Sequence, residues 1–263
     1  ASNTSHFGST PLPLLAIPGT HDSATYGIDS SSDMADDGNV NGPEKVTDFT
    51  GKVSHWCHST GWTPHWLCSA IDDVIDYDIN PIATNIAKSV QAPWCKSQDQ
   101  TILQQLKGGI RFLDLRVQGY KEGAFRIVHS MVSVSMSQVL DDIATFCKQP
   151  ESSREIIVVD LRNYKMTPDL DDKLISLIKT KLVNAQGESL LIPRSDLSAV
   201  TLNSIWNTPG RVMVFYADSP YDKSIVETHP ELWFKNPGDG NTVDGPGTLV
   251  SYYPNTNTTV GLV

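Results

Sequence analysis

Hydrophobic and polar positions change their spacing several times along the chain. Three segments repeat apolar residues at intervals of three and four, as amphipathic helices do: 97–107, 135–146 and 167–182. Four others are short and rich in β-branched or aromatic residues, as strands are: 110–117, 125–129, 155–161 and 211–216. The alternation of strands with helices predicts an α/β fold, in which helices cover a parallel sheet.

Short polar motifs predict where the helices begin and end. Ser97 and Ser135 are each followed three residues later by Gln, which is the spacing of a capping box. Thr167 stands directly before a proline, as a helix cap often does. Gly108 and Gly109 then end the first helix. We therefore expect the three helices to start at these three caps.

The remaining strands are less regular. Residues 13–18 read as a short buried strand, and 248–253 as a weaker one. Residues 155–161 are apolar on both faces, which is typical of a central strand in a parallel sheet. These strands are too few to close an eight-stranded barrel.

The segment 27–94 departs from this pattern. Its first part, 27–54, reads as an exposed polar loop, and 69–90 shows loose helical turns interrupted by Pro81. The segment also holds a group of aromatic and imidazole side chains: Trp56, Trp62, Trp66, Trp94, His55, His58 and His65. The group fits a lipid-contacting surface, a subdomain with a tryptophan core, or a histidine metal site. We predict a single domain over 1–263, with 27–94 as an insertion.

Composition narrows the class of protein. The 263 residues are 39% hydrophobic and 19% charged, as in globular proteins. A formal net charge of −10 repels phosphate backbones, so we expect no nucleic-acid partner. The same charge argues against docking of a basic surface on anionic membranes. Apolar runs are far shorter than the ~20 residues of a transmembrane helix.

The cysteines fit no zinc signature. Cys57, Cys68, Cys95 and Cys147 include no C-x2-C spacing. A disulfide between Cys57 and Cys68 would close the Trp-rich segment, but all three connectivities stay open. The chain starts on a polar segment without a signal peptide, as a processed protein does. We expect an extracellular location, with the cytoplasm as the alternative.

Ionisable residues gather where the apolar strands end. The set is His21, Asp22, Asp114, Arg116, His129, Asp160 and Arg162. Strand side chains alternate with period two, so Asp114 shares a face with Arg116, and Asp160 shares one with Arg162. The carboxyl ends of parallel strands form the edge where α/β folds bind ligands. The set therefore predicts a functional site, although ion pairs that join the strands would explain any one pair alone.

Two histidines and an arginine in one pocket suit phosphodiester chemistry. One imidazole takes a proton from an attacking hydroxyl, and the other protonates the departing oxygen. A guanidinium grips the phosphate oxygens while charge builds in the transition state. A carboxylate beside a histidine fixes its tautomer and raises its basicity.

Four segments in this order resemble the motifs of phosphatidylinositol-specific phospholipases C of the X-domain family. They are 15–23, 109–117, 127–129 and 155–162, the first reading Leu-Ala-Ile-Pro-Gly-Thr-His-Asp-Ser. The resemblance implies an irregular TIM barrel whose last strands this chain lacks. It also implies an enzyme that cleaves phosphatidylinositol, or a glycosylated form, to diacylglycerol and inositol 1,2-cyclic phosphate at a membrane surface. We expect a monomer.

The resemblance also assigns roles. It implies that His21 is the general base, that His129 is the general acid, and that Arg116 stabilises the phosphate. Asp114 belongs to the same catalytic group, and Asp22 serves the leaving-group side. Arg162, with Asp160 beside it, stands where bacterial members carry a substrate-contacting lysine. Ala217 stands where they carry an arginine, which makes polyphosphorylated headgroups poor candidates.

Position 116 bears on metal dependence. Calcium-dependent members of the family place a carboxylate there, whereas this chain places Arg116. A fixed positive charge would replace the ion, so we expect neither a metal nor another cofactor. Two alternatives stay open: a catalytically weak phosphoinositide headgroup-binding module on the same fold, and a glycerophosphodiester phosphodiesterase that would need a metal.

Overall fold

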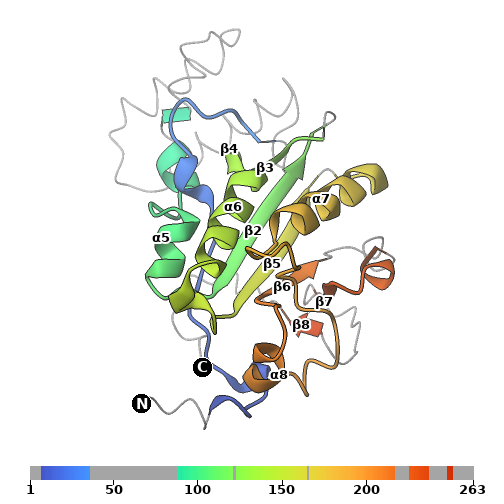
Figure 1. Ribbon diagram of the computed structural model, residues 1–263. Helices are drawn as coiled ribbons and strands as arrows, with labels where there is room; N and C mark the ends of the chain where they lie inside the picture. Colours follow the sequence, from blue (N-terminus) through green and yellow to red (C-terminus); the bar gives the residue numbers. More distant parts are fainter. Residues whose placement is uncertain are drawn as a thin grey trace, which may run out of the picture.

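The computed structural model describes most of the chain, and its strands form one sheet (Figure 1). The described residues are 7–35, 88–89, 91–120, 123–164, 166–216, 225–236 and 248–250. Within them the eight-stranded sheet runs in the order β4-β3-β2-β5-β6-β7-β8, with β1 paired to β2. Several predictions lie outside these residues, including the 36–87 part of the insertion and the Cys57–Cys68 disulfide.

The centre of the sheet is parallel, as predicted. It consists of β2 (Phe112–Gly119), β5 (Ile157–Tyr164), β6 (Val212–Tyr216), β7 (Leu232–Asn236) and β8 (Thr248–Val250). The short β1 (Gly19–Thr20) pairs in parallel with the start of β2. The register sets Asp114 beside Asp160 and Arg116 beside Arg162 on adjacent strands. The two predicted Asp–Arg pairs, Asp114–Arg116 and Asp160–Arg162, therefore lie side by side.

Two strands run against the rest. Strand β3 (Phe125–His129) pairs antiparallel with the end of β2, and β4 (Met131–Ser135) pairs antiparallel with β3. The prediction that His129 ends a parallel strand is therefore wrong. The short connection between β2 and β3 explains the reversal, because a parallel pair needs a crossover of a dozen or more residues. Strands β4 and β7 and the short helix α8 (Leu202–Trp206) were not predicted from the sequence.

The strand predicted at 13–18 is also wrong. A 3-10 helix covers Leu12–Leu14, and regular pairing starts only at Gly19. Pro13 and Pro18 lack the N–H group that a ladder needs, which explains the loss of pairing. The Pro18 carbonyl still accepts hydrogen bonds from the N–H groups of Arg111 and Phe112, which attaches the segment to β2.

Three of the helices match the predicted segments, one of them with a shifted start, and α8 is an addition. They are α5 (Ile102–Lys107), α6 (Met136–Cys147), α7 (Pro168–Lys181) and the short α8 (Leu202–Trp206). Ser135 and Thr167 cap α6 and α7 as predicted. Thr101, not Ser97, caps α5: its hydroxyl accepts from Gln104 N–H, and the Gln104 side chain accepts from Thr101 N–H. The spacing S/T-x-x-Q occurs again four residues after Ser97, at Thr101, and local packing selects Thr101 as the cap.

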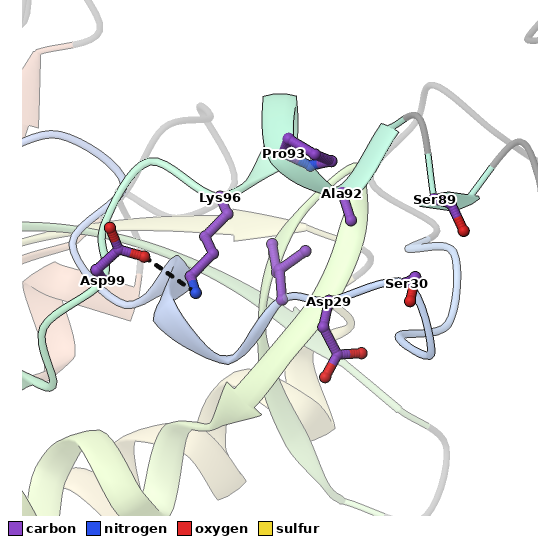
Figure 2. A pocket seen from close by; sticks show the side chains of 8 residues that line it. Asp29, Ser30, Ser89, Ala92, Pro93, Lys96 and Asp99 are labelled. Atoms are coloured by element: carbon purple, nitrogen blue, oxygen red, sulfur yellow. Dashed lines mark ion pairs between the residues drawn. The ribbon is translucent and has the colours of Figure 1, made fainter.

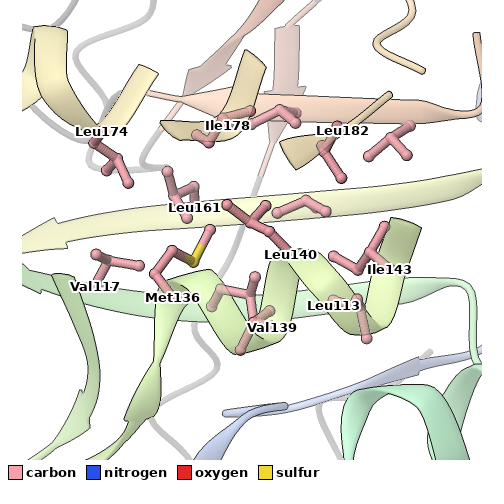
Figure 3. Close-up of a cluster of buried hydrophobic side chains, with 14 of the residues drawn as sticks. Leu113, Val117, Met136, Val139, Leu140, Ile143, Leu161, Leu174, Ile178 and Leu182 are labelled. Atoms are coloured by element: carbon pink, nitrogen blue, oxygen red, sulfur yellow. The ribbon is translucent and has the colours of Figure 1, made fainter. Parts of the chain in front are cut away.

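The two faces of the sheet differ in how far their apolar side chains extend. On the outer face, α6 and α7 pack their apolar stripes against Leu113, Val117 and Leu161, forming the main core (Figure 3). The inner face is apolar only around Val158, Met213, Phe215 and Trp233, which form a second cluster with Ile205 of α8. Farther along this inner face, Asp114, Arg116, Asp160 and Arg162 replace the apolar side chains.

The α/β class is therefore confirmed. Among the described strands none joins β8 to β1, so the sheet is an incomplete barrel that is open at this edge. No helix of the described residues is long and apolar enough to cross a membrane. The single-domain arrangement of 1–263 remains a prediction.

Candidate functional site

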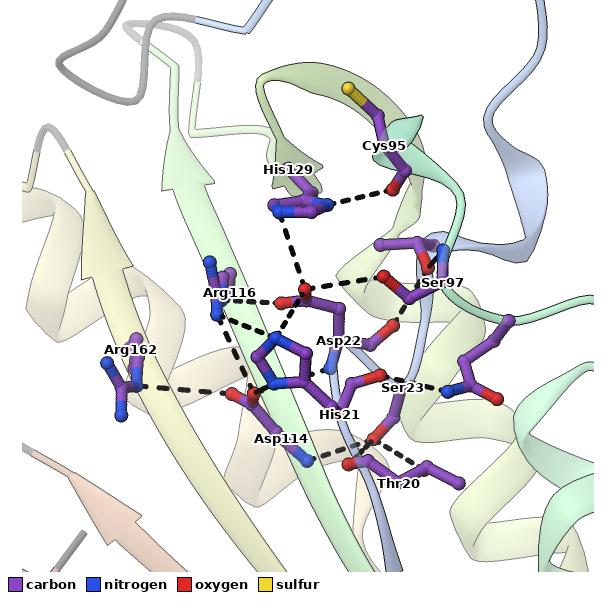
Figure 4. Close-up of polar contacts among 12 residues, drawn as sticks. Thr20, His21, Asp22, Ser23, Cys95, Ser97, Asp114, Arg116, His129 and Arg162 are labelled. Atoms are coloured by element: carbon purple, nitrogen blue, oxygen red, sulfur yellow. Dashed lines mark hydrogen bonds and ion pairs between the residues drawn. The ribbon is translucent and has the colours of Figure 1, made fainter. Parts of the chain in front are cut away.

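The site is built on the turn that follows β1 (Figure 4). Ser23 N–H donates to the Asp114 carbonyl at 2.8 Å, and the Ser23 hydroxyl accepts from Asp114 N–H at 2.9 Å. Asp22, with φ of 47°, takes a left-handed conformation that few residues other than glycine adopt. The turn thereby carries His21 and Asp22 onto the inner face of β2.

A buried glutamine of α5 supports this turn. The Gln105 amide donates to the carbonyls of Ser23 and Gln100, both at 2.7 Å, and its oxygen accepts from the Thr20 hydroxyl. Gln105 is only 2% exposed, so these bonds are made without water. They fix the position of the turn that carries His21.

The His21 ring lies between two carboxylates. Its Nδ1 is 2.8 Å from Asp114 Oδ2, and its Nε2 is 3.0 Å from Asp22 Oδ2. The hydrogen bonds to Asp114 and then Asp22 outweigh partial burial and raise the pKa of His21 from 6.5 to about 9. His21 is therefore an imidazolium at neutral pH before any substrate binds.

Asp114 and Asp22 are both buried, and each has a cationic partner. Burial alone would raise the pKa of Asp114, but the His21 hydrogen bond and the Arg116 charge lower it below its usual range. The Asp22 side chain is fully buried, and its Oδ1 lies 2.5 Å from Arg116 Nε. Arg116 Nη2 is also 3.4 Å from His21 Nε2, so all four groups form one connected cluster.

His129 reaches the same cluster from the antiparallel strand β3. Its Nδ1 lies 2.9 Å from the Cys95 carbonyl, which can only accept, so Nδ1 carries a proton. Its Nε2 lies 3.4 Å from Asp22 Oδ2, the same oxygen that contacts His21 Nε2. Because β3 runs back along β2, the last residue of β3 lies beside the middle of β2, not beside the carboxyl end of β2.

The last two predicted residues lie on β5. Arg162 Nε is 4.0 Å from Asp114 Oδ1, at the edge of the cluster. Asp160 is buried and sits beside Asp114 in the register. The structure thus brings six of the seven predicted residues into contact, and it places Asp160 on the same face beside them.

Sequence reasoning missed the segment that covers this cluster. Besides the Cys95 carbonyl, the Ser97 hydroxyl lies 3.5 Å from Asp22 Oδ2, and the Gln98 amide donates to the His21 carbonyl at 3.0 Å. The other side of this segment lines a cavity of about 550 Å³ beside Asp29, where Lys96 and Asp99 form an ion pair (Figure 2). Backbone and neutral polar contacts of this kind leave no spacing signal in a sequence.

A metal ion fits the cluster poorly. Donor atoms of His21, Asp22 and Asp114 lie within 4.8 Å of one another, a spacing that metal ions use. However, Asp22 is already paired with Arg116, and both nitrogens of His21 face carboxylates. A divalent cation there would displace these bonds and meet the fixed charge of Arg116.

An incomplete α/β barrel with an imidazole–carboxylate–guanidinium cluster on its inner face defines the class of this protein. The sequence model of "Phosphatidylinositol-specific phospholipase C, X domain" matches residues 80–217, more than half of the chain. The chain belongs to this family.

Relatives at the sequence level carry the same family name. Human "PI-PLC X domain-containing protein 1" is 26% identical over 226 residues, which cover 85% of this chain and 56% of that protein. "Variant-surface-glycoprotein phospholipase C" of Trypanosoma cruzi is 26% identical over 171 residues, 64% of this chain and 37% of that protein. The chain therefore spans about half the length of the curated relatives it matches.

Solved structures give a more distant likeness. Phosphatidylinositol-specific phospholipase C of Staphylococcus aureus aligns with a TM-score of 0.45 and 20% identity, over 79% of this chain and 49% of that one.

Proposed function

We propose that this chain is the catalytic part of a phospholipase C that cleaves phosphatidylinositol or a glycosylated form of it. One observation carries the proposal: Nε2 of His21 and Nε2 of His129 contact the same oxygen of Asp22, with Arg116 on its other oxygen. Two proton-transfer groups and a fixed cation are thus within reach of a single phosphodiester group. Membership of the X-domain family supports this assignment.

The reaction we propose has a defined proton path. Nε2 of His21, once deprotonated, takes the proton of the inositol 2-hydroxyl, and that oxygen bonds to phosphorus. The bond from phosphorus to the glycerol oxygen breaks, and Nε2 of His129 donates a proton to that oxygen. Diacylglycerol leaves, and inositol 1,2-cyclic phosphate remains.

The other residues act on charge and orientation. Arg116 faces the phosphate oxygens as negative charge builds, and Asp114 holds the His21 ring through Nδ1. Asp22 orients His129 on the leaving-group side. Arg162 and Asp160, next along the inner face, would contact the inositol ring.

Phosphorus NMR tests the proposal directly. The protein is incubated with phosphatidylinositol in detergent micelles with EDTA, alongside His21→Ala and the matched control His229→Ala. His229 pairs with Glu231 outside the cluster, so its loss should change nothing. We expect the cyclic phosphate signal from the wild type and the control, and none from His21→Ala. No signal from the wild type, with EDTA or with added calcium, would contradict an enzymatic function.

One observation favours the alternative of a headgroup-binding module. The pKa of His21 is raised to about 9, so His21, Arg116 and Arg162 gather three cationic groups beside the aspartates that hold them, where they can meet an anionic headgroup. A module of this kind would bind inositol 1-phosphate in a titration, lose that binding on Arg116→Gln, and give no product in the NMR experiment. An extracellular location, a monomeric state and the absence of a nucleic-acid partner remain predictions.

A further inference from the structure

A cavity with two arginines lies at the other end of the sheet from the His21 cluster. Its volume is about 530 Å³, and it is lined by Ser153, Arg154, Asn203, Trp206, Asn207 and Arg211. Arg154 and Arg211 precede the parallel strands β5 and β6, so they stand at the amino end of the sheet, where Asn203 and Trp206 of α8 line the same cavity. Figure 1 shows where α8 lies. The apolar cluster around Val158 and Phe215 lies farther along the same strands.

The two guanidinium groups of the cavity are held in place. Arg211 Nε donates to the Ser153 carbonyl at 2.6 Å, and its Nη1 donates to the Thr208 carbonyl at 2.8 Å. The Arg154 guanidinium stacks over the Trp206 ring, 5.2 Å from its centroid, while Trp206 Nε1 donates to the Arg154 carbonyl. A stacked guanidinium uses its face for the ring, so its N–H edge stays available for a ligand.

The charge of this cavity is not balanced by the protein. Among the described residues, no carboxylate oxygen lies within 4 Å of a nitrogen of Arg154 or Arg211, and no acidic side chain lines the cavity. In contrast, Arg111, Arg116 and Arg162 each have a carboxylate partner. Two uncompensated guanidinium groups in a chain of net charge −10 point to an anionic ligand.

We propose that this cavity binds a small phosphate-bearing anion. The hydroxyl of Ser153 and the amides of Asn203 and Asn207 surround the two arginines with neutral donors. Together they can satisfy more acceptor oxygens than a carboxylate presents, which favours a phosphate group. The volume lies within the range of small-molecule sites, ~300–1,000 Å³.

A titration with inorganic phosphate tests this site by calorimetry. Arg154→Gln removes one cation, and Asn207→Asp places a carboxylate in the cavity without removing a side-chain bond of the fold. Arg126→Gln and Gln186→Glu are the matched controls, since they make the same chemical changes on exposed positions elsewhere. We expect each cavity variant to weaken one phosphate-binding component by about tenfold or more, and the controls to leave it unchanged.

A second experiment distinguishes a lipid headgroup from a soluble phosphate as the ligand. Phosphatidylcholine vesicles with and without phosphatidic acid are sedimented with the same variants. Loss of both phosphate and phosphatidic acid binding on Arg154→Gln identifies a lipid headgroup, and loss of phosphate binding alone identifies a soluble ligand. Phosphate binding by the cavity variants equal to that of the wild type, with their melting temperatures unchanged, would overturn the proposal. Phosphate held at the His21 cluster does not obscure the result, because neither substitution touches that cluster.

Discussion

At the residue scale, the site is defined by which carboxylate oxygen each imidazole nitrogen contacts. Asp22 Oδ2 lies against both imidazoles, while Asp114 Oδ2 contacts only one of them, that of His21. The first contact links the two imidazoles, and the second is the largest cause of the raised pKa of His21. Changing one carboxylate should therefore have a different effect from changing the other.

The substitution Asp114→Asn should move the pH dependence of the activity. Removing the carboxylate at Nδ1 lowers the pKa of His21 from about 9 toward 6.5, because the largest cause of its upward shift is lost. If His21 is the base, the acidic limb of log kcat/KM against pH shifts to lower pH, while the maximal rate falls. Initial rates measured from about pH 5 to about pH 10, a range that spans both pKa values, show the shift of the acidic limb. Asp169→Asn, at an exposed ion pair, is the control, and an unmoved limb would argue that another group is the base.

The substitution Gln105→Met should loosen the turn that carries His21. It keeps the volume but leaves the carbonyls of Ser23 and Gln100 without their buried donor. We expect a loss of about 1–3 kcal/mol in the free energy of unfolding, measured by urea denaturation. Lys107→Met, exposed on the same helix, should have little effect. Equal stabilities of the two variants would show that the Gln105 contacts contribute nothing net.

At the element scale, capping and strand direction decide where the site residues go. The α6 and α7 caps follow directly from local sequence, because Ser135 and Thr167 accept hydrogen bonds within their own first turns. For α5, local sequence offers both Ser97 and Thr101. Ser97 is instead part of the segment that covers the cluster, where its N–H donates to the Thr25 hydroxyl.

The choice between the two caps of α5 has a measurable consequence. Thr101→Ala should reduce the free energy of unfolding by about 1 kcal/mol, the usual value of an N-cap, because its hydroxyl serves Gln104 N–H. Ser97→Ala should reduce it less, since its hydroxyl contact with Asp22 is 3.5 Å long. Thermal denaturation of both variants measures the difference. A larger loss for Ser97→Ala would mean that the helix starts earlier in solution.

At the scale of the whole molecule, the sheet carries two separate polar regions on either side of an apolar layer. The His21 cluster occupies one part of the inner face, and the Arg154–Arg211 cavity lies at the amino end beside α8. Ile205 of α8 packs with Met213 and Trp233 in the layer between them. Substitutions in the cavity therefore leave the residues of the His21 cluster untouched, and the reverse also holds.

The stability of the whole protein should depend on pH through His21. Because folding raises its pKa from 6.5 to about 9, the stabilisation is complete below pH 6.5 and is lost as the pH rises through 9. The side chain is 51% exposed, so solvent screening reduces the effect to about 1 kcal/mol. Melting temperatures of the wild type should fall over this interval by a few degrees more than those of His21→Gln. Parallel curves for the two proteins would contradict the raised pKa.

Local sequence was enough to predict the α/β class, the positions of α6, α7, β2, β5 and β6, and the residues of the cluster. These depend on local patterns: the period of apolar side chains, caps within one turn, and charged residues within apolar strands. Three features came only from the packing of the folded chain: β3 runs antiparallel, residues 13–18 form no strand, and Gln105 and the Cys95 carbonyl hold the His21 turn and His129. Strand direction and backbone contacts depend on the packing of segments far apart in the chain, whose energies no local pattern contains.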